Sequence, residues 1–172
     1  AVQSPYVLVD AGTYAINASV GGNSLGSSSV SLAAGSDTTL IVTGSSVSDA
    51  KVTVVVDDNR VPTSSGNYKI RLIHASDSLA SYPLTFTVSL SALFSGVQFA
   101  PTQYASSSTS TYVSKAAVSN AVIAVTVPGT GATIYSTTAS DGVSLASGKV
   151  YTMFVLDTAA NNTPTALLLQ ER

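Results

Sequence analysis

The chain has 172 residues, of which 45% are apolar and 9% charged, and its seven basic and nine acidic residues leave a net charge of −2. This apolar share is enough to bury a core in one large or two small domains. So weak a net charge excludes nucleic acid and anionic lipid as partners held by electrostatic attraction. Because the sequence contains no cysteine, it also excludes a disulfide framework, a thiol nucleophile and a thiolate metal site.

The sequence contains no candidate transmembrane helix. Such a helix needs about 20 consecutive apolar residues, and Ser, Thr or Gly interrupts every apolar run of this chain after a few residues. Residues 1–5 have neither the charged nor the apolar segment of an export signal, so we expect any such signal to have been removed or to lie outside these residues. Because so few residues are charged, the surface must be hydrated mostly by Ser, Thr, Asn and Gly. This composition favours an exported β protein.

Alternating apolar and polar residues predict β-strands along most of the chain. Tyr14, Ile16 and Ala18, for example, fall on one face of an extended segment, with polar or small residues between them. In chain order, strands are predicted around residues 13–20, 52–56, 70–73, 84–90, 123–127 and 167–169. Glycine-rich and asparagine-rich turns separate them. The predicted fold class is all-β, with two tandem antiparallel β-sandwich modules of immunoglobulin-like or prealbumin-like strand order.

An internal repeat is the most specific feature of the sequence. The segment Val30-Ser31-Leu32-Ala33-Ala34-Gly35 reappears as Val143-Ser144-Leu145-Ala146-Ser147-Gly148, 113 positions later. Tyr6-Val7 matches Tyr112-Val113 at an offset of 106, and residues 54–58 match residues 167–171 at an offset of 113. Repetition at a fixed period indicates that one structural unit occurs twice.

Two whole copies of a unit of about 110 residues would need about 220 residues, more than the 172 present. We therefore predict a first module at residues 1–66 that lacks its initial strands, and a complete second module at residues 67–172. The first module has no counterpart to the strands expected from residue 68 to about residue 100. A sandwich that lacks two strands exposes an apolar groove and an unpaired edge, so something must cover them.

Several short motifs resemble one bacterial family. The segment Arg71-Leu72-Ile73-His74-Ala75-Ser76 is similar to the opening strand of the family catalogued as domain of unknown function 4397. The resemblance extends to residues 9–14, 32–35, 57–62, 145–148 and 167–172. It implies a tandem β-sandwich protein of the bacterial envelope, exported and often anchored through an N-terminal cysteine, with no catalytic residues to transfer. This sequence departs from that pattern because it has no cysteine.

Candidate catalytic and metal-binding residues are few. His74, the only histidine, stands beside Ser76 and Asp77, but neighbours on one strand end point in different directions and do not form a triad. The run Asp57-Asp58-Asn59, Asp141, and Asp157 with Asn161 offer oxygen atoms without the spacing of a calcium loop. Such residues at strand ends more often form turns. We assign no catalytic, cofactor-binding or metal-binding residue and no cofactor.

These observations favour a non-enzymatic, exported structural or adhesive β-sandwich protein of the cell envelope or extracellular space. One alternative is a filament or pilus-like subunit that self-assembles by β-strand donation or swapping, with the chain itself as partner. A second alternative is a module that binds a surface glycan or protein. No nucleic-acid partner is expected.

Overall fold

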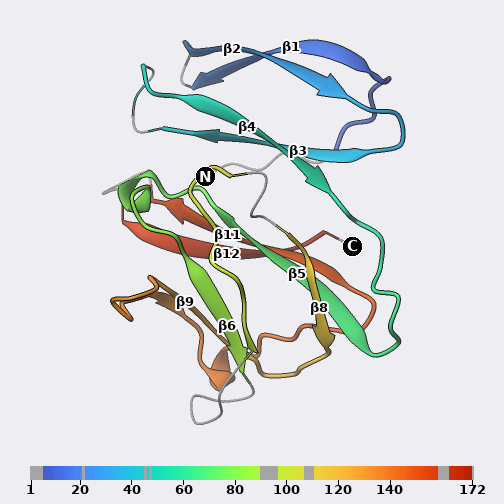
Figure 1. Ribbon diagram of the computed structural model, residues 1–172, viewed down its shortest axis with the longest axis vertical. Coiled ribbons are helices and arrows are strands. Elements are labelled where there is room, and N and C mark those ends of the chain that lie inside the picture. Colours follow the sequence, from blue (N-terminus) through green and yellow to red (C-terminus); the bar gives the residue numbers. More distant parts are fainter. Residues whose placement is uncertain are drawn as a thin grey trace. The chain divides into compact units, whose positions relative to one another are not determined.

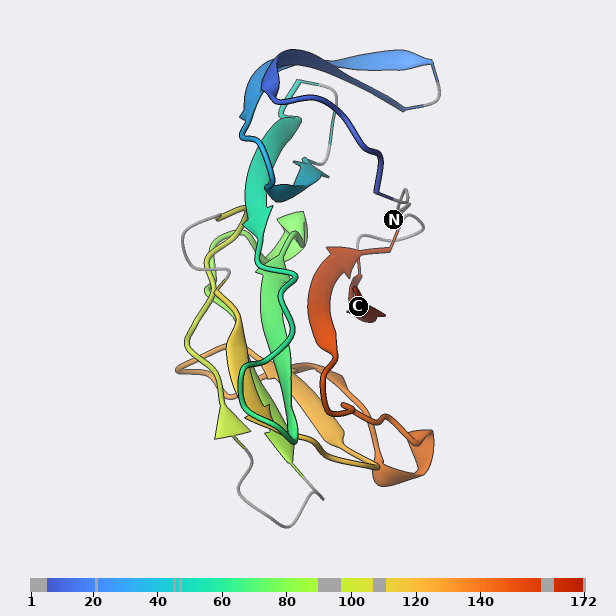
Figure 2. The same cartoon turned by 90° about the vertical axis from the view of Figure 1, so that its right-hand side faces the viewer.

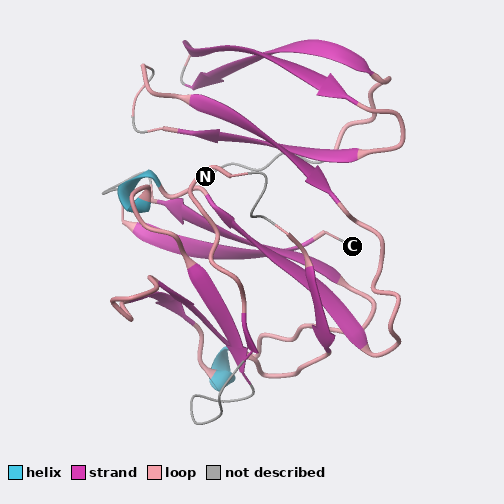
Figure 3. Ribbon diagram, in the orientation of Figure 1, coloured by secondary structure: helices cyan, strands magenta, loops and turns pink. Residues whose placement is uncertain are grey.

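The computed structural model describes residues 6–20, 22–44, 46, 48–89, 97–106, 111–158 and 163–171. These residues form β-strands with two single turns of 3-10 helix, so the predicted all-β fold is confirmed (Figures 1 and 3). The strands are β1 (Gly12–Val20), β2 (Asn23–Leu32), β3 (Asp37–Thr43), β4 (Lys51–Asp57), β5 (Asn67–His74), β6 (Thr85–Ser89), β7 (Val97–Gln98), β8 (Val113–Ala116), β9 (Val122–Thr126), β10 (Thr133–Ser136), β11 (Val150–Asp157) and β12 (Pro164–Gln170). The helical turns are η1 (Asp77–Leu79) and η2 (Ala139–Asp141). Within the described residues, no helix is both long and apolar enough to cross a membrane.

The chain divides into a first unit, residues 1–58, and a second unit, residues 59–172. This division falls a few residues before the module boundary expected after residue 66. The segment from Asn59 to Gly66, which leads into β5, therefore belongs to the second unit.

The second unit is built from two four-stranded sheets, in the orders β12-β11-β5-β8 and β10-β9-β6-β7. Figure 2 shows β5 between β11 and β8. The pairing is antiparallel except between β5 and β11, which run parallel. In the constant-type immunoglobulin sandwich the first two strands share a sheet, whereas here β5 and β6 lie in different sheets. Of the two strand orders that the sequence leaves open, only the prealbumin-like one remains for this unit.

The hydrophobic core of the second unit lies between these sheets. Its largest fully buried side chains include Tyr68, Phe86, Leu145 and Met153. The β5 strand is buried along nearly its whole length. Its core residues Tyr68, Ile70 and Leu72 alternate with Lys69, Arg71 and Ile73 on the other face of the sheet. Phe86 and Phe99 stack with ring centroids 3.9 Å apart. The core cluster defined by the described residues runs from Tyr68 to Val155, so all its buried members belong to the second unit.

The first unit consists of two hairpins, β1-β2 and β3-β4, each a two-stranded antiparallel sheet. In β1 the half-buried Tyr14, Ile16 and Ala18 alternate with exposed neighbours, as the sequence pattern predicts. In the described part of the chain, β3 pairs with β4 alone and β1 pairs with β2 alone. Each of these four strands therefore keeps one edge without a ladder partner among the described residues.

The four strands of the first unit match the last four strands of the second. The pair Gly12↔Leu32 of the first hairpin corresponds to the bridge Val118↔Leu145, at the offsets of 106 and 113 seen in the sequence. By the same matching, β3 corresponds to β11 and β4 to β12. The positions of β5 and β6, the neighbours of β11 and β9 in the second unit, have no counterpart in the described first unit.

The register of the second hairpin corrects one part of the sequence alignment. Thr39 pairs with Val55 in the first unit, and Thr152 pairs with Leu169 in the second. Val55 therefore matches Leu169 at an offset of 114, and Asp57 matches Glu171. The sequence alignment at 113 matched Asp58 to Glu171 and is wrong by one residue, because the β11-β12 connection is one residue longer than its counterpart.

Candidate functional site

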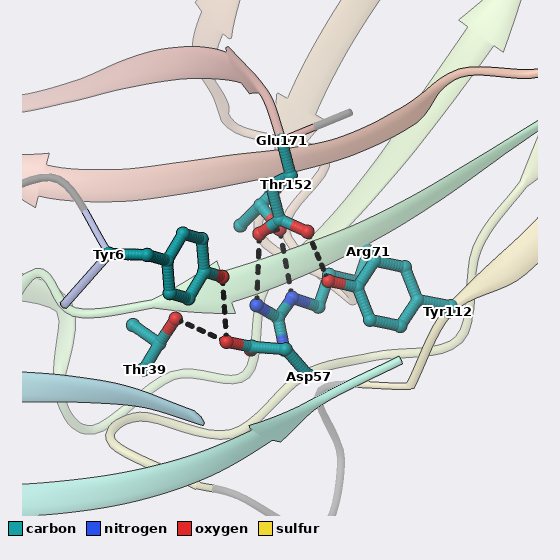
Figure 4. Close-up of polar contacts among 7 residues, drawn as sticks. All are labelled: Tyr6, Thr39, Asp57, Arg71, Tyr112, Thr152 and Glu171. Atoms are coloured by element: carbon teal, nitrogen blue, oxygen red, sulfur yellow. Dashed lines mark hydrogen bonds and ion pairs between the residues drawn. The ribbon is translucent and has the colours of Figure 1, made fainter. Parts of the chain in front are cut away.

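A buried ionic cluster lies in the second unit, on the face of β5 and β11 that carries Thr152 (Figure 4). Arg71 of β5 stands directly opposite Thr152 of β11. Its Nε donates to Thr152 Oγ1 over 2.8 Å, and its Nη2 lies 3.0 Å from Glu171 Oε1. The Arg71 and Glu171 side chains are 0% and 2% exposed. We call Arg71, Tyr112, Thr152 and Glu171 the second-unit carboxylate site.

Two hydroxyl groups also hold the Glu171 carboxylate. Thr152 Oγ1 donates to Oε1 over 2.5 Å, and the Tyr112 hydroxyl donates to Oε2. Burial raises the pKa of Tyr112 far above its usual value, and although the Arg71 charge opposes this effect, the phenol stays protonated and able to donate. The Tyr112 ring faces the Arg71 guanidinium at 4.5 Å from its centroid, a cation–π contact. Glu171 thus receives hydrogen bonds from the cation and from both hydroxyls.

The first unit contains the same set of hydroxyls and carboxylate. Tyr6 donates its hydroxyl to Asp57 Oδ2 over 2.8 Å, and Thr39 donates Oγ1 to the same oxygen over 2.7 Å (Figure 4). Tyr6 matches Tyr112, Thr39 matches Thr152 and Asp57 matches Glu171 in the strand correspondence. We call these three residues the first-unit carboxylate site. The strand position that supplies Arg71 in the second unit has no counterpart among the described strands of the first.

Neither carboxylate site was predicted from the sequence. The sequence offers Asp57 as a possible calcium ligand and as part of the repeat and of a family motif, and Arg71 and Glu171 only as parts of strand motifs. The match of Tyr6-Val7 to Tyr112-Val113 could have indicated that the two tyrosines have the same role. The sequence alignment of the second hairpin, however, was shifted by one residue and matched Asp58 instead of Asp57 to Glu171.

His74 lies at the end of β5 and is buried, with 1% of its surface exposed. Its Nε2 lies 3.2 Å from the Leu79 carbonyl oxygen and 3.1 Å from that of Tyr82, while its Nδ1 accepts from the Ser76 backbone N–H at 3.4 Å. This pattern requires a neutral ring protonated on Nε2. Burial lowers the pKa of His74, against the smaller opposite effects of the two carbonyls and Asp157.

The polar residues that follow His74 turn toward other partners. Ser76 Oγ donates to Asp157 Oδ1 over 2.7 Å, and Asp77 accepts from the Tyr104 hydroxyl at 3.0 Å. The structure thus places Ser76, His74 and Asp77 near one another in the chain without the serine–histidine–aspartate hydrogen bonds that a triad uses.

Two further candidate metal ligands, Asp157 and Asp141, serve as turn acceptors. Asp157 accepts from Ser76 and from both the hydroxyl and backbone N–H of Ser78. Partial burial raises the pKa of Asp157, but these hydrogen bonds outweigh it and hold the pKa below its usual value. Asp141 accepts from the Thr138 backbone N–H and caps η2. Asn161 lies outside the described residues, and no group of three metal-ligating side chains occurs within them.

The fold and the paired carboxylate sites define a protein of β-sandwich units in which one pattern of strands and polar contacts occurs twice. The family model DUF4397, described as a domain of unknown function, matches residues 2–82. This segment of the chain belongs to that family, as the resemblance of its motifs implied. The match runs through β1 to β5 and η1, and the motifs at 145–148 and 167–172 lie beyond it. No curated protein matches the chain.

Proposed function

We propose that this chain is a non-enzymatic, exported structural module of tandem β-sandwich units whose first unit is completed by a β-strand from outside residues 1–172. The observation that carries the proposal is the pairing of β3. Its counterpart β11 lies between β12 and β5, whereas β3 has only β4 beside it in the described chain. Unpaired strand edges bind other strands through their backbone groups.

The side chains of β3 support the same conclusion. Leu40 and Val42 are 36% and 45% exposed, whereas their counterparts Met153 and Val155 are fully buried in the second-unit core. Burying an apolar side chain of this size contributes about 1.5 to 3 kcal/mol. An added strand and the residues that follow it would recover part of this free energy in the first unit.

The family membership and the composition support an exported structural role. The segment that the family model matches is built mainly of β-strands, and the surface relies on uncharged polar residues. A glycan-binding face has less support, because Tyr6 and Tyr82 are the only large aromatic side chains among the described residues that are exposed. Stacking on sugars needs an aligned row of such rings.

Calorimetry of residues 1–172 with a synthetic strand tests this proposal. The probe is a peptide with the sequence of residues 66–76, which contains β5, and the control is a peptide of the same composition in shuffled order. We expect two unfolding transitions, with the β5 peptide raising only the lower one, because a ligand stabilises the unit that it binds. Equal effects of both peptides on both transitions would reject strand acceptance.

Light scattering over a range of protein concentrations tests whether a second copy of the chain, rather than another strand, pairs with the edge of β3. We expect a constant mass equal to one chain. A mass that grows with concentration and falls when the β5 peptide is added would show that a second copy fills the edge, which favours the self-assembling filament instead.

A further inference from the structure

We propose that the strand that completes the first unit pairs along both of its edges, with β3 on one side and with residues 7–10 on the other. Residues 7–10 then form the edge strand of a four-stranded sheet, as β8 does in the second unit. This inference rests on the proposed function and deepens it, because it identifies the second side of the binding site and the kind of strand that fits it.

The repeat makes residues 7–10 the counterpart of β8. Tyr6-Val7 matches Tyr112-Val113 at the offset of 106, so residues 7–10 match residues 113–116, which are the whole of β8. In the second unit β5 lies between β8 and β11. The first unit thus has a counterpart of each neighbour of β5, and the strand between them has none among the described strands.

The tyrosine that precedes each segment makes the same contact in both units. Tyr112 donates its hydroxyl to Glu171, directly after β12. Tyr6 donates its hydroxyl to Asp57, the last residue of β4, over 2.8 Å. In the second unit this contact reaches past β5, because β5 and β11 lie between β8 and β12. The same contact in the first unit therefore starts residues 7–10 at the place of β8, with the place of one strand between them and β3.

Residues 7–10 have the exposure of a segment without a neighbour. Leu8 is 99% exposed, and Val7 and Val9 are exposed as well. In the described chain these residues belong to no strand, whereas β8 pairs with β5 and its Val113 packs against the core. Contiguous exposed apolar surface is typical of interaction sites, and a strand beside residues 7–10 would cover part of it.

The ladder between β5 and β8 shows which backbone groups of residues 7–10 face the accepted strand. Directly after β8, the Ala117 N–H donates to the carbonyl of the residue opposite it, over 2.8 Å. Bonded pairs recur at every second residue of an antiparallel ladder, so Lys115 and Val113 also bond β5. Their counterparts Val9 and Val7 therefore present N–H and C=O groups to the accepted strand.

The ladder between β5 and β11 gives the matching edge of β3. Ala75 donates its N–H to the carbonyl of Val155, so the backbone groups of Val155 face β5. Alternate residues of a strand present their backbone groups to the same edge. The counterparts of Tyr151, Met153 and Val155, which present theirs to the edge of β3 away from β4, are Thr38, Leu40 and Val42.

The accepted strand must carry apolar residues at alternate positions. Three alternate residues of β5 pack in the core, and these are Tyr68, Ile70 and Leu72. Their ladder partners on β8 and β11 include Val113 and Met153. In the first unit the same places hold Val7 and Leu40, which are apolar and exposed. The partner is therefore an extended protein segment with the alternation of β5, antiparallel to residues 7–10 and parallel to β3.

Backbone methylation of a peptide tests this pairing on the full chain. The peptide has the sequence of residues 66–76, and N-methylation at Ile70 removes an N–H that faces residues 7–10. The control is N-methylation at Leu72, which points to the same side beyond the last pair of the β5–β8 ladder. We expect the first change to weaken binding at least about five-fold and the second less than about two-fold.

The outcomes separate the two proposals. Equal affinity of the two methylated peptides would show that the strand pairs with β3 alone, which overturns the two-sided site and leaves strand acceptance standing. Failure of the unmodified peptide to bind would contradict strand acceptance itself.

Proline variants of the protein test the same edge from the other side. Val9→Pro removes an N–H that faces the accepted strand, and Leu8→Pro is the matched control because the N–H of Leu8 points the opposite way. Both residues lie outside the described strands, so the circular dichroism of each variant should equal that of the unaltered chain. Val9→Pro should weaken peptide binding at least about five-fold and Leu8→Pro less than about two-fold. Equal binding by Val9→Pro and the unaltered chain would overturn the proposal.

Discussion

Arg71 is a buried charged residue on the face of β5 that lies away from the hydrophobic core, and its charge is balanced at short range. It contacts the Glu171 carboxylate, the Thr152 hydroxyl and the Tyr112 ring. A buried ion pair of this kind contributes little net stability compared with apolar side chains, but removing one partner is costly. We therefore expect the ion pair to contribute more to the choice of strand partners than to the free energy of unfolding.

Arg71→Met should destabilise the second unit by about 3 to 5 kcal/mol, because it leaves the Glu171 carboxylate buried without its cation. The double variant Arg71→Met with Glu171→Leu should recover most of that loss. Urea unfolding of the single and double variants measures both values. A double variant as unstable as the single one would show that the buried charge is not the cause.

His74 gives the second unit a pH-dependent stability. Because burial lowers its pKa below the usual 6.5, the unfolded chain binds more protons than the folded chain between that lowered value and pH 6.5. Stability is therefore complete above pH 6.5 and declines as the pH falls through this range. The Asp157 carboxylate, whose pKa is also lowered, adds its own loss at more acidic pH, below its usual value of 3.8.

Urea midpoints of the second unit between pH 5 and 7.5 test this dependence. His74→Gln should remove most of the decline over that range, whatever its effect on stability at pH 7.5. Parallel curves for His74→Gln and the unaltered chain would place the titrating group elsewhere.

At the scale of the element, the strands could be predicted from the sequence because their pattern is local. Alternation identifies β1, β6 and β9, and the apolar run of residues 70–73 identifies β5. The parallel pairing of β5 with β11 could not be predicted, because it joins residues about 80 positions apart and no local pattern records a partner. The carboxylate sites could not be predicted for the same reason, because matching Asp57 to Glu171 requires the register of both hairpins to within one residue.

The difference between β3 and β11 predicts different responses to proline. Leu40→Pro removes an N–H that faces the open edge of β3, so it should leave the β3-β4 hairpin folded while abolishing binding of the β5 peptide. Met153→Pro removes an N–H from a strand paired on both sides and should unfold the second unit. Circular dichroism and peptide titration of both variants provide the measurement, and peptide binding to Leu40→Pro with unchanged affinity would contradict the assigned edge.

At the scale of the whole molecule, the two units share a strand pattern but differ in completeness. Among the described residues, the second unit has eight strands and a buried core, whereas the first has four strands that match β9 to β12. The repeat length in the sequence predicts a first module without its initial strands, and this stays a prediction. The structure adds that, among the described residues, β3 pairs only with β4 and β1 only with β2.

Hydrogen exchange of residues 1–172 alone compares these edges directly. The amides of Thr38, Leu40 and Val42 should exchange much faster than those of Tyr151, Met153 and Val155, their counterparts in a strand paired on both sides. The β5 peptide should slow the first set and leave the second unchanged. If the two sets are protected equally without peptide, β3 already has a partner and the first unit does not accept a strand from outside.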